Sequence, residues 1–316
     1  MNTLNSIPLR FGDPATSIAA NSTCIAYGTA FGKVEAFNFE TQEFFQITEI
    51  SEEYIGSISL SSTNTLTFTI GDYYSKQIEY PYTTGKTLNQ AYSRIHTLED
   101  CSNCKNRLIH LYSNSLTFIF NQKICLVPTN GMNIYTLSIP EQSCKLQNPL
   151  PPHSIPIDFY DDKILIEHYS LTGSRQFSHF YFEKGVSEVI FQLDEKIHMT
   201  STKLFNNGIA FIGDYSSINL YNNLSEYFEV PFESQAEIVA FGIYEKENDL
   251  WAGVVDCEGK VTILKNWRIF QTGEIQYKGI IVKDFDKGYP YVLAIHPPCI
   301  TVSSDNFVHI LIFLFN

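Results

Sequence analysis

TSIAANSTCIAYGTAFGKVEAFNF, residues 16–39, contains three short apolar segments separated by turn residues. The segments are 16–20, 24–27 and 34–39, and Ala30-Phe31-Gly32-Lys33 connects the last two. Aromatic and β-branched residues favour strands, whereas glycine and small polar residues favour tight turns. The stretch therefore predicts strands joined by hairpins, and the rest of the chain repeats this unit in weaker form.

Seven apolar segments recur along the chain at intervals of 41 to 50 residues. A four-stranded propeller blade occupies about 40–50 residues, so each segment is predicted to be the second strand of one blade. The seven segments are CIAYG (24–28), LTFTIG (66–71), LTFIF (116–120), ILIEH (164–168), IAFIG (209–213), LWAGV (250–254) and CITVS (299–303). After a turn, the next strand of each unit is expected at 34–39, 77–80, 124–127, 177–182, 218–221, 261–264 and 307–313.

Many of these strands are apolar along their whole length and do not alternate with polar residues. Such runs indicate that both faces of the sheet are covered, as happens when sheets stack radially in a propeller. A doubly wound α/β fold also covers both faces, but it needs a helix of roughly a dozen residues between strands. The connections in this chain are shorter and rich in Pro, Gly, Asn and Ser, which argues against that fold.

The last unit has three strands, at 291–296, 299–303 and 307–313, and lacks a fourth. SIPLRF (6–11) precedes the first unit and has no unit of its own. We therefore expect this N-terminal strand to complete the last blade and close the ring, because closure removes exposed sheet edges.

The predicted fold is all-β, a single closed β-propeller domain over residues 1–316 with about seven four-stranded blades. A count of six or eight blades stays open, because the borders near 89–105 and 266–283 are weakly marked.

Two stretches, AIHPPCITVSSDNFVHILIF (294–313) and residues 16–39, resemble blades of the WD40-repeat propeller family. The resemblance covers nearly the whole chain, but the Gly-His and Trp-Asp dipeptides of that family are absent, and Trp251 and Trp267 do not stand at the usual strand end. The resemblance implies a rigid platform for protein partners.

Composition limits the classes of partner and the compartment. The net charge of −13 opposes direct binding to nucleic acid and to an anionic membrane surface. No apolar run reaches the roughly 18–20 residues of a membrane span, and the N-terminal sequence has no secretory-signal pattern. An odd count of seven cysteines fits a reducing compartment, so we expect an intracellular location, in the cytoplasm or a cytoplasm-facing assembly.

Few residues form a pattern with chemistry. Cys101-Ser102-Asn103-Cys104 could hold a metal or act as a redox pair, but a second CxxC is missing, so free thiols are the favoured interpretation. The eight histidines stand in none of the common catalytic motifs. We therefore expect no cofactor and no catalytic residues.

The turns give a different signal. In an up-and-down blade, turns after second strands and connections after fourth strands emerge on one face. That face collects acidic and aromatic residues, which would suit a protein partner with a basic surface. The alternative is that acidic turns only keep a Phe-rich protein soluble. The candidate protein-binding residues are Phe31, Asp72, Tyr73, Tyr74, Asp214, Tyr215, Asp256 and Asp305.

Together these observations predict a non-enzymatic scaffold or adaptor subunit of a larger intracellular complex. The alternative is a propeller enzyme or small-ligand binder that uses the central channel. The predicted first strands, which would line that channel, are mainly apolar or small, and only Asp158 and His296 could carry chemistry there.

Overall fold

The computed structural model describes the chain at residues 5–10, 15–39, 41–49, 54–60, 65–71, 82–84, 86–87, 95–97, 116–120, 123–127, 135–138, 143–146, 148–152, 154–170, 174–192, 199–223, 226–247, 249–277, 280–282, 285, 291–304 and 307–313. Every regular element in these segments is a β-strand. Within them no helix is long and apolar enough to cross a membrane.

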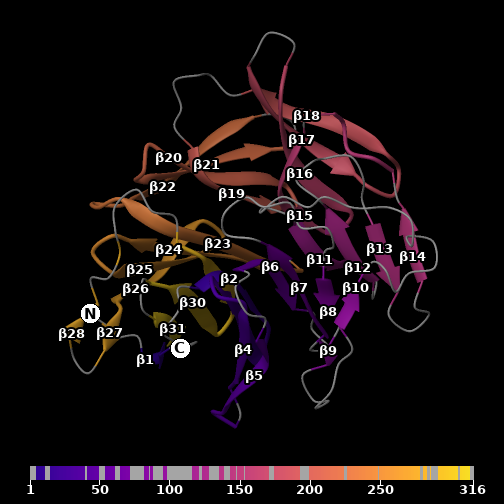
Figure 1. The fold of residues 1–316 in the computed structure, drawn as a ribbon. Helices are drawn as coiled ribbons and strands as arrows, with labels where there is room; N and C mark the ends of the chain where they lie inside the picture. Colours follow the sequence, from indigo (N-terminus) through magenta and orange to yellow (C-terminus); the bar gives the residue numbers. More distant parts are fainter. Residues whose placement is uncertain are drawn as a thin grey trace. The chain divides into compact units, whose positions relative to one another are not determined.

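Most of the described chain forms six four-stranded sheets built from antiparallel strands (Figure 1). In five of these sheets the spatial order of the strands is their order along the chain. These sheets are β2(Ala15–Ala20)-β3(Cys24–Thr29)-β4(Lys33–Asn38)-β5(Phe44–Glu49); β11(Leu116–Phe120)-β12(Lys123–Val127)-β13(Tyr135–Ser138)-β14(Ser143–Leu146); β15(Ile155–Tyr160)-β16(Lys163–Tyr169)-β17(Arg175–Tyr181)-β18(Val186–Gln192); β19(Met199–Phe205)-β20(Gly208–Gly213)-β21(Ser217–Asn222)-β22(Tyr227–Glu233); and β23(Ile238–Lys246)-β24(Asp249–Asp256)-β25(Lys260–Lys265)-β26(Arg268–Glu274).

The sixth sheet joins the two ends of the chain. Its order is β1(Asn5–Arg10)-β31(Phe307–Ile312)-β30(Cys299–Ser303)-β29(Leu293–His296). β1 and β31 pair antiparallel from Asn5 opposite Ile312 to Arg10 opposite Phe307. This pairing confirms that the N-terminal strand supplies the fourth strand of the last unit.

Three smaller sheets complete the described structure. One has three strands, β6(Tyr54–Leu60)-β7(Thr65–Gly71)-β9(Lys86–Thr87). The other two are pairs, β8(Tyr82–Thr84) with β10(Ile95–Thr97) and β27(Gln276–Tyr277) with β28(Ile280–Ile281).

The segments predicted as second strands correspond to β3, β7, β16, β20, β24 and β30, and each is the second strand of its sheet when the last sheet is counted from β29. The assignment of 116–120 is wrong, because β11 is the first strand of its sheet and 124–127, in β12, is the second. The expected strand at 77–80 lies outside the described residues. The closed ring, its seven blades and the single domain stay predictions.

The strands divide between two compact units, residues 1–22 with 194–316, and residues 23–193. In the first unit the sheets β19–β22 and β23–β26 bury a shared cluster that includes Ile212, Ile218, Ala252 and Leu264. All six residues of β20 are buried. The continuous apolar runs of the sequence therefore correspond, in this unit, to strands covered on both faces.

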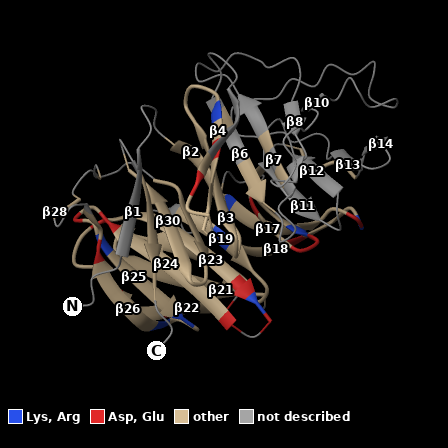
Figure 2. Cartoon of the chain, turned by 90° about the horizontal axis from the view of Figure 1, so that it is seen from below, with Lys and Arg blue, Asp and Glu red and all other residues tan. Residues whose placement is uncertain are grey.

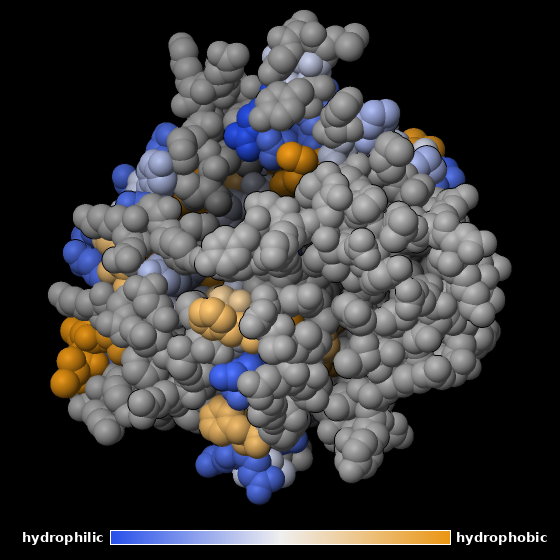
Figure 3. All heavy atoms as spheres, viewed as in Figure 1, coloured by the Kyte–Doolittle hydropathy of each residue, from blue (hydrophilic) through white to orange (hydrophobic). Residues whose placement is uncertain are grey.

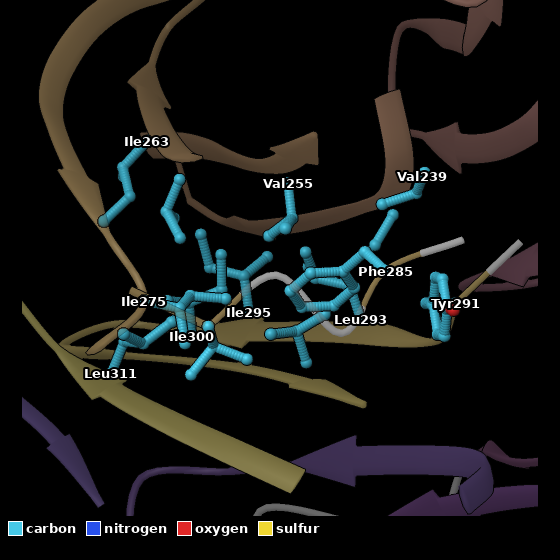
Figure 4. Close-up of a cluster of buried hydrophobic side chains, with 14 of the residues drawn as sticks. Val239, Val255, Ile263, Ile275, Phe285, Tyr291, Leu293, Ile295, Ile300 and Leu311 are labelled. Atoms are coloured by element: carbon cyan, nitrogen blue, oxygen red, sulfur yellow. The ribbon is translucent and has the colours of Figure 1, made fainter. Parts of the chain in front are cut away.

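A second cluster of the first unit packs the sheet β23–β26 against the last sheet (Figure 4). Ile263 and Ile300 in it are fully buried, and each such side chain stabilises the fold by about 1.5–3 kcal/mol. The two sheets approach closely at Gly253, where a Cβ atom would lie 2.4 Å from Cδ1 of Ile300. A glycine at this place in β24 therefore permits the packing.

Four of the outermost strands, β5, β18, β22 and β26, carry a bulge against the third strand of their sheet. A bulge bends the strand and interrupts the row of backbone groups that another strand could pair with. The bulges on the outer strands thus protect the sheet edges. The charged residues, by contrast, gather mainly at strand ends and turns (Figure 2).

Candidate protein-binding surface

The structure describes four of the residues predicted to bind a protein partner, namely Phe31, Asp214, Tyr215 and Asp256. The remaining predicted site residues lie outside the described residues, and these are Asp72, Tyr73, Tyr74, Asp305 and the possible metal pair Cys101 and Cys104.

Asp256, the last residue of β24, is 4% exposed and so does not offer its carboxylate to a partner. Its Oδ1 accepts hydrogen bonds from the backbone N–H groups of Glu258 and Lys260, each at 3.0 Å. Its Oδ2 accepts one from the Ser234 hydroxyl at 3.3 Å. Burial raises the pKa of this carboxyl group, although the hydrogen bonds oppose the shift. Asp256 therefore shapes the turn, which differs from the exposed role expected from the sequence.

The turn between β3 and β4 is built in the same way around Thr29, which is fully buried. Oγ1 of Thr29 accepts hydrogen bonds from the backbone N–H groups of Phe31 at 3.4 Å and Lys33 at 3.1 Å. These donors stand two and four residues after the acceptor, as they do after Asp256. The side chain of Phe31 is 58% exposed at the tip of this turn.

A glycine occupies the fourth position of both turns. Gly32 has a φ of 78° and Gly259 a φ of 77°, a left-handed conformation that glycine adopts without steric cost. The N–H of Gly259 donates to the carbonyl of Asp256 at 3.0 Å, and the N–H of Gly32 donates to that of Thr29 at 3.4 Å. The two turns therefore share the same hydrogen bonds, as expected for copies of one repeated unit.

Asp214 and Tyr215 form a different, two-residue turn between β20 and β21. Their φ values are 47° and 65°, and the N–H of Ser216 donates to the carbonyl of Gly213 at 3.3 Å. Positive φ at both central residues defines a type I′ turn, which prefers Asn-Gly or Asp-Gly. Tyr215 thus stands, 36% exposed, where glycine would fit with less strain. Strained residues of this kind concentrate at functional sites.

Backbone hydrogen bonds hold this turn against its neighbours in the first unit. The N–H of Ile238 donates to the carbonyl of Tyr215 at 2.6 Å, and that of Ser234 to Ser216 at 2.9 Å. The N–H of Cys257 donates to the carbonyl of Glu237 at 2.8 Å. We call the turns 213–216 and 256–259, with the connection 234–238, the turn cluster. Its assembly agrees with the expected grouping of second-strand turns with fourth-strand connections.

The surface of the turn cluster is acidic. Asp214 and Glu258 are exposed in its turns, and Glu233 is exposed where β22 enters the connection. Lys260, which follows the second turn, is half-buried. An excess of carboxylates around an exposed tyrosine would attract a partner that carries Lys or Arg.

The two residues expected to carry chemistry in a channel, Asp158 and His296, are half-buried and belong to different units. The His296 ring lies 4.4 Å from the Tyr244 ring, and burial lowers the pKa of the imidazole. Among the described residues, no group of three or more His, Cys, Asp or Glu side chains is placed to hold a metal ion.

Sequence reasoning missed several exposed apolar residues on the outer strands. Tyr227 and Phe228 on β22 are each 49% exposed, and Ile269 on β26 is 57% exposed. A hydrophobic patch also marks the edge where β28 lies, with Ile280 73% exposed (Figure 3). The repeat spacing predicts the second and third strands of each unit. It does not predict the positions of the outer strands or the exposure of their side chains. The available signal was the aromatic pair Tyr227-Phe228 beside three glutamates, Glu226, Glu229 and Glu233.

No protein-family model matches the sequence. No curated protein matches it either. The fold is similar to that in the crystal structure of Raptor from Chaetomium thermophilum, with a TM-score of 0.65 and 10% sequence identity. The match covers 98% of this chain but only 29% of the Raptor chain. This likeness concerns the fold, and together with the antiparallel sheets it is compatible with a WD40-like β-propeller.

Proposed function

We propose that the protein is a non-enzymatic scaffold or adaptor subunit of a larger intracellular complex. It presents turns and sheet rims to protein partners on a fold that changes little when it binds. The turn cluster is the observation that supports this proposal. There, Tyr215 is held by a backbone hydrogen bond in a strained conformation and stands among exposed carboxylates.

The turn cluster has the features of a preorganised contact surface. Exposed aromatic residues are frequent hot spots of protein interfaces. The backbone of a hydrogen-bonded turn loses little conformational freedom when a partner binds, and this lowers the cost of association. The carboxylates select against acidic partners and increase the rate of encounter with basic ones.

Purification of the tagged protein at its natural level, followed by mass spectrometry, tests the proposed function. We expect partner proteins in fixed stoichiometry. A protein that returns alone and monomeric would contradict the scaffold role.

A double variant, Asp214→Asn with Tyr215→Gly, tests the turn cluster itself. Asn-Gly is the preferred type I′ sequence, so the variant keeps the turn while removing the carboxylate and the aromatic ring. We expect it to lose at least one partner while its thermal stability is at least that of the wild type, since the substitution relieves the strain at residue 215. Glu247→Gly is the matched control, because it removes one exposed carboxylate at a positive φ of 58° in a different turn. A variant that retains every partner would exclude the turn cluster as the contact.

A further inference from the structure

The outer strand β22 exposes a compact group of aromatic and acidic side chains. Tyr227 and Phe228 are each 49% exposed, and Glu226, Glu229 and Glu233 are exposed beside them. We call these five residues the β22 rim. Tyr227 stands opposite Tyr221 on β21, and Phe228 stands opposite Leu220. Because successive residues of a strand point to opposite faces, the rim offers one aromatic ring on each face of the sheet.

Tyr227 is fixed before any partner arrives. Its ring lies 5.4 Å from that of Tyr221, and the Tyr221 ring stacks on the buried Phe211 at 6.0 Å. Its hydroxyl donates a hydrogen bond to Oδ1 of Asn219 at 2.5 Å. An aromatic row thus leads from the interior of the sheet to the rim. A side chain held in this way has little rotamer entropy left to lose on binding.

The negative charge around the rim is nearly uncompensated along the sequence. From Leu204 to Glu245 the chain contains six Asp or Glu residues and no Lys, Arg or His. Burial raises the pKa of the Tyr227 hydroxyl, and the charges of Glu229 and Asp214 raise it further. The negative electrostatic potential that disfavours the tyrosinate anion favours a cation at the same place. An aromatic ring beside carboxylates can also bind a guanidinium or ammonium group through its π face.

A partner cannot easily extend this sheet with a strand of its own. Pro231 has no N–H to donate, and the residues between Glu229 and Glu233 form a bulge against Ile218. We therefore expect recognition at the β22 rim to depend on side chains more than on backbone pairing.

Building on the proposed function, we propose that the β22 rim is the docking surface for a partner-protein segment that combines Arg or Lys with apolar side chains. The basic groups pair with Glu226, Glu229 and Glu233 and stack on Tyr227, while the apolar groups pack on Phe228. Charge complementarity selects this occupant over a second copy of the same chain, whose own rim is equally acidic.

Selection of peptides on the full chain tests the inference. The probe is a display library of random 12-residue peptides. The selected peptides are then synthesised, and their affinities for the protein are measured by fluorescence anisotropy. We expect enrichment of Arg or Lys together with apolar residues, and affinities that fall as salt rises. Tyr227→Ser with Phe228→Ser, and separately Glu226→Gln with Glu229→Gln and Glu233→Gln, should each weaken binding about tenfold or more.

Val186→Ser with Val189→Ser is the matched control, since these residues are 47% and 56% exposed on the outer strand β18. It should leave the affinity unchanged. Selected peptides without basic residues, or equal affinities for the wild-type and both rim variants, would overturn the inference. So would wild-type self-association, measured by sedimentation, that is lost in the Tyr227→Ser, Phe228→Ser variant.

The native complex separates this inference from the proposed function. If the rim variants purify with the full set of partners, the β22 rim is not the contact, and the scaffold role stands. If the wild-type protein purifies alone, the scaffold role itself fails.

Discussion

Asp256 and Thr29 occupy the same position in turns of two different sheets, and each accepts hydrogen bonds from the N–H groups two and four residues later. Removing the acceptor leaves those donors unsatisfied. We expect Asp256→Ala to lower the free energy of unfolding by about 1–3 kcal/mol in urea denaturation. Asp256→Thr should recover much of this loss, because Thr29 already performs the same task. Equal losses for both variants would show that the side-chain acceptor is unimportant.

Asp256 also makes a pH-dependent contribution. Its pKa is raised by burial, so folding favours the protonated carboxyl group. The stability that comes from this protonation is fully present below the ordinary carboxyl pKa of about 3.9, and it is lost as the pH rises through the folded-state pKa. Asp256→Asn keeps an acceptor at Oδ1 and cannot ionise. We therefore expect the free energy of unfolding of Asp256→Asn, relative to that of the wild type, to increase from pH 4 to pH 7. A constant difference across that range would contradict the shift.

Pairing of β1 with β31 is the element-scale feature with the clearest test. Deleting residues 1–12 removes a ladder of six paired residues and exposes the backbone of β31. We expect the free energy of unfolding to fall by about 3 kcal/mol or more, since each lost hydrogen bond contributes about 1 kcal/mol. A synthetic peptide of residues 1–12, added in trans, should restore part of it. A deletion variant with the wild-type denaturation midpoint would mean that this strand contributes little.

Strand positions followed well from the sequence, and strand order within a sheet followed less well. At β11 and β12 the segments LTFIF and KICLV are equally apolar, so hydrophobicity could not show that 116–120 is a first strand. At the binding surface, Asp256 was expected to be exposed because it is a charged residue in a turn. The structure shows instead that its carboxylate is buried and hydrogen-bonded within the turn. The pattern that could have shown this is the match of Asp256 and Gly259 with Thr29 and Gly32. The β22 rim was missed because the repeat spacing marks inner strands.

At the scale of the whole molecule, the prediction of one closed domain concerns cooperativity. A ring in which every sheet is supported on both faces should unfold in a single transition, with equal calorimetric and van't Hoff enthalpies. Differential scanning calorimetry of residues 1–316 measures both. Residues 23–193, expressed alone, should lack a cooperative transition, because the sheet β2–β5 then loses β2. Two separate transitions, or a folded 23–193 fragment, would indicate two domains.

The sheet that joins β1 to β31 also has a consequence for biosynthesis. The ribosome makes Arg10 nearly 300 residues before Phe307, the residue that stands opposite it. At about 5–20 residues per second, β1 waits roughly 15–60 seconds for its partner strand. During that time the segment that becomes β1 has no partner strand, and unpaired strand edges of this kind favour aggregation. A chain that lacks the residues of β31 would leave β1 without the strand it pairs with.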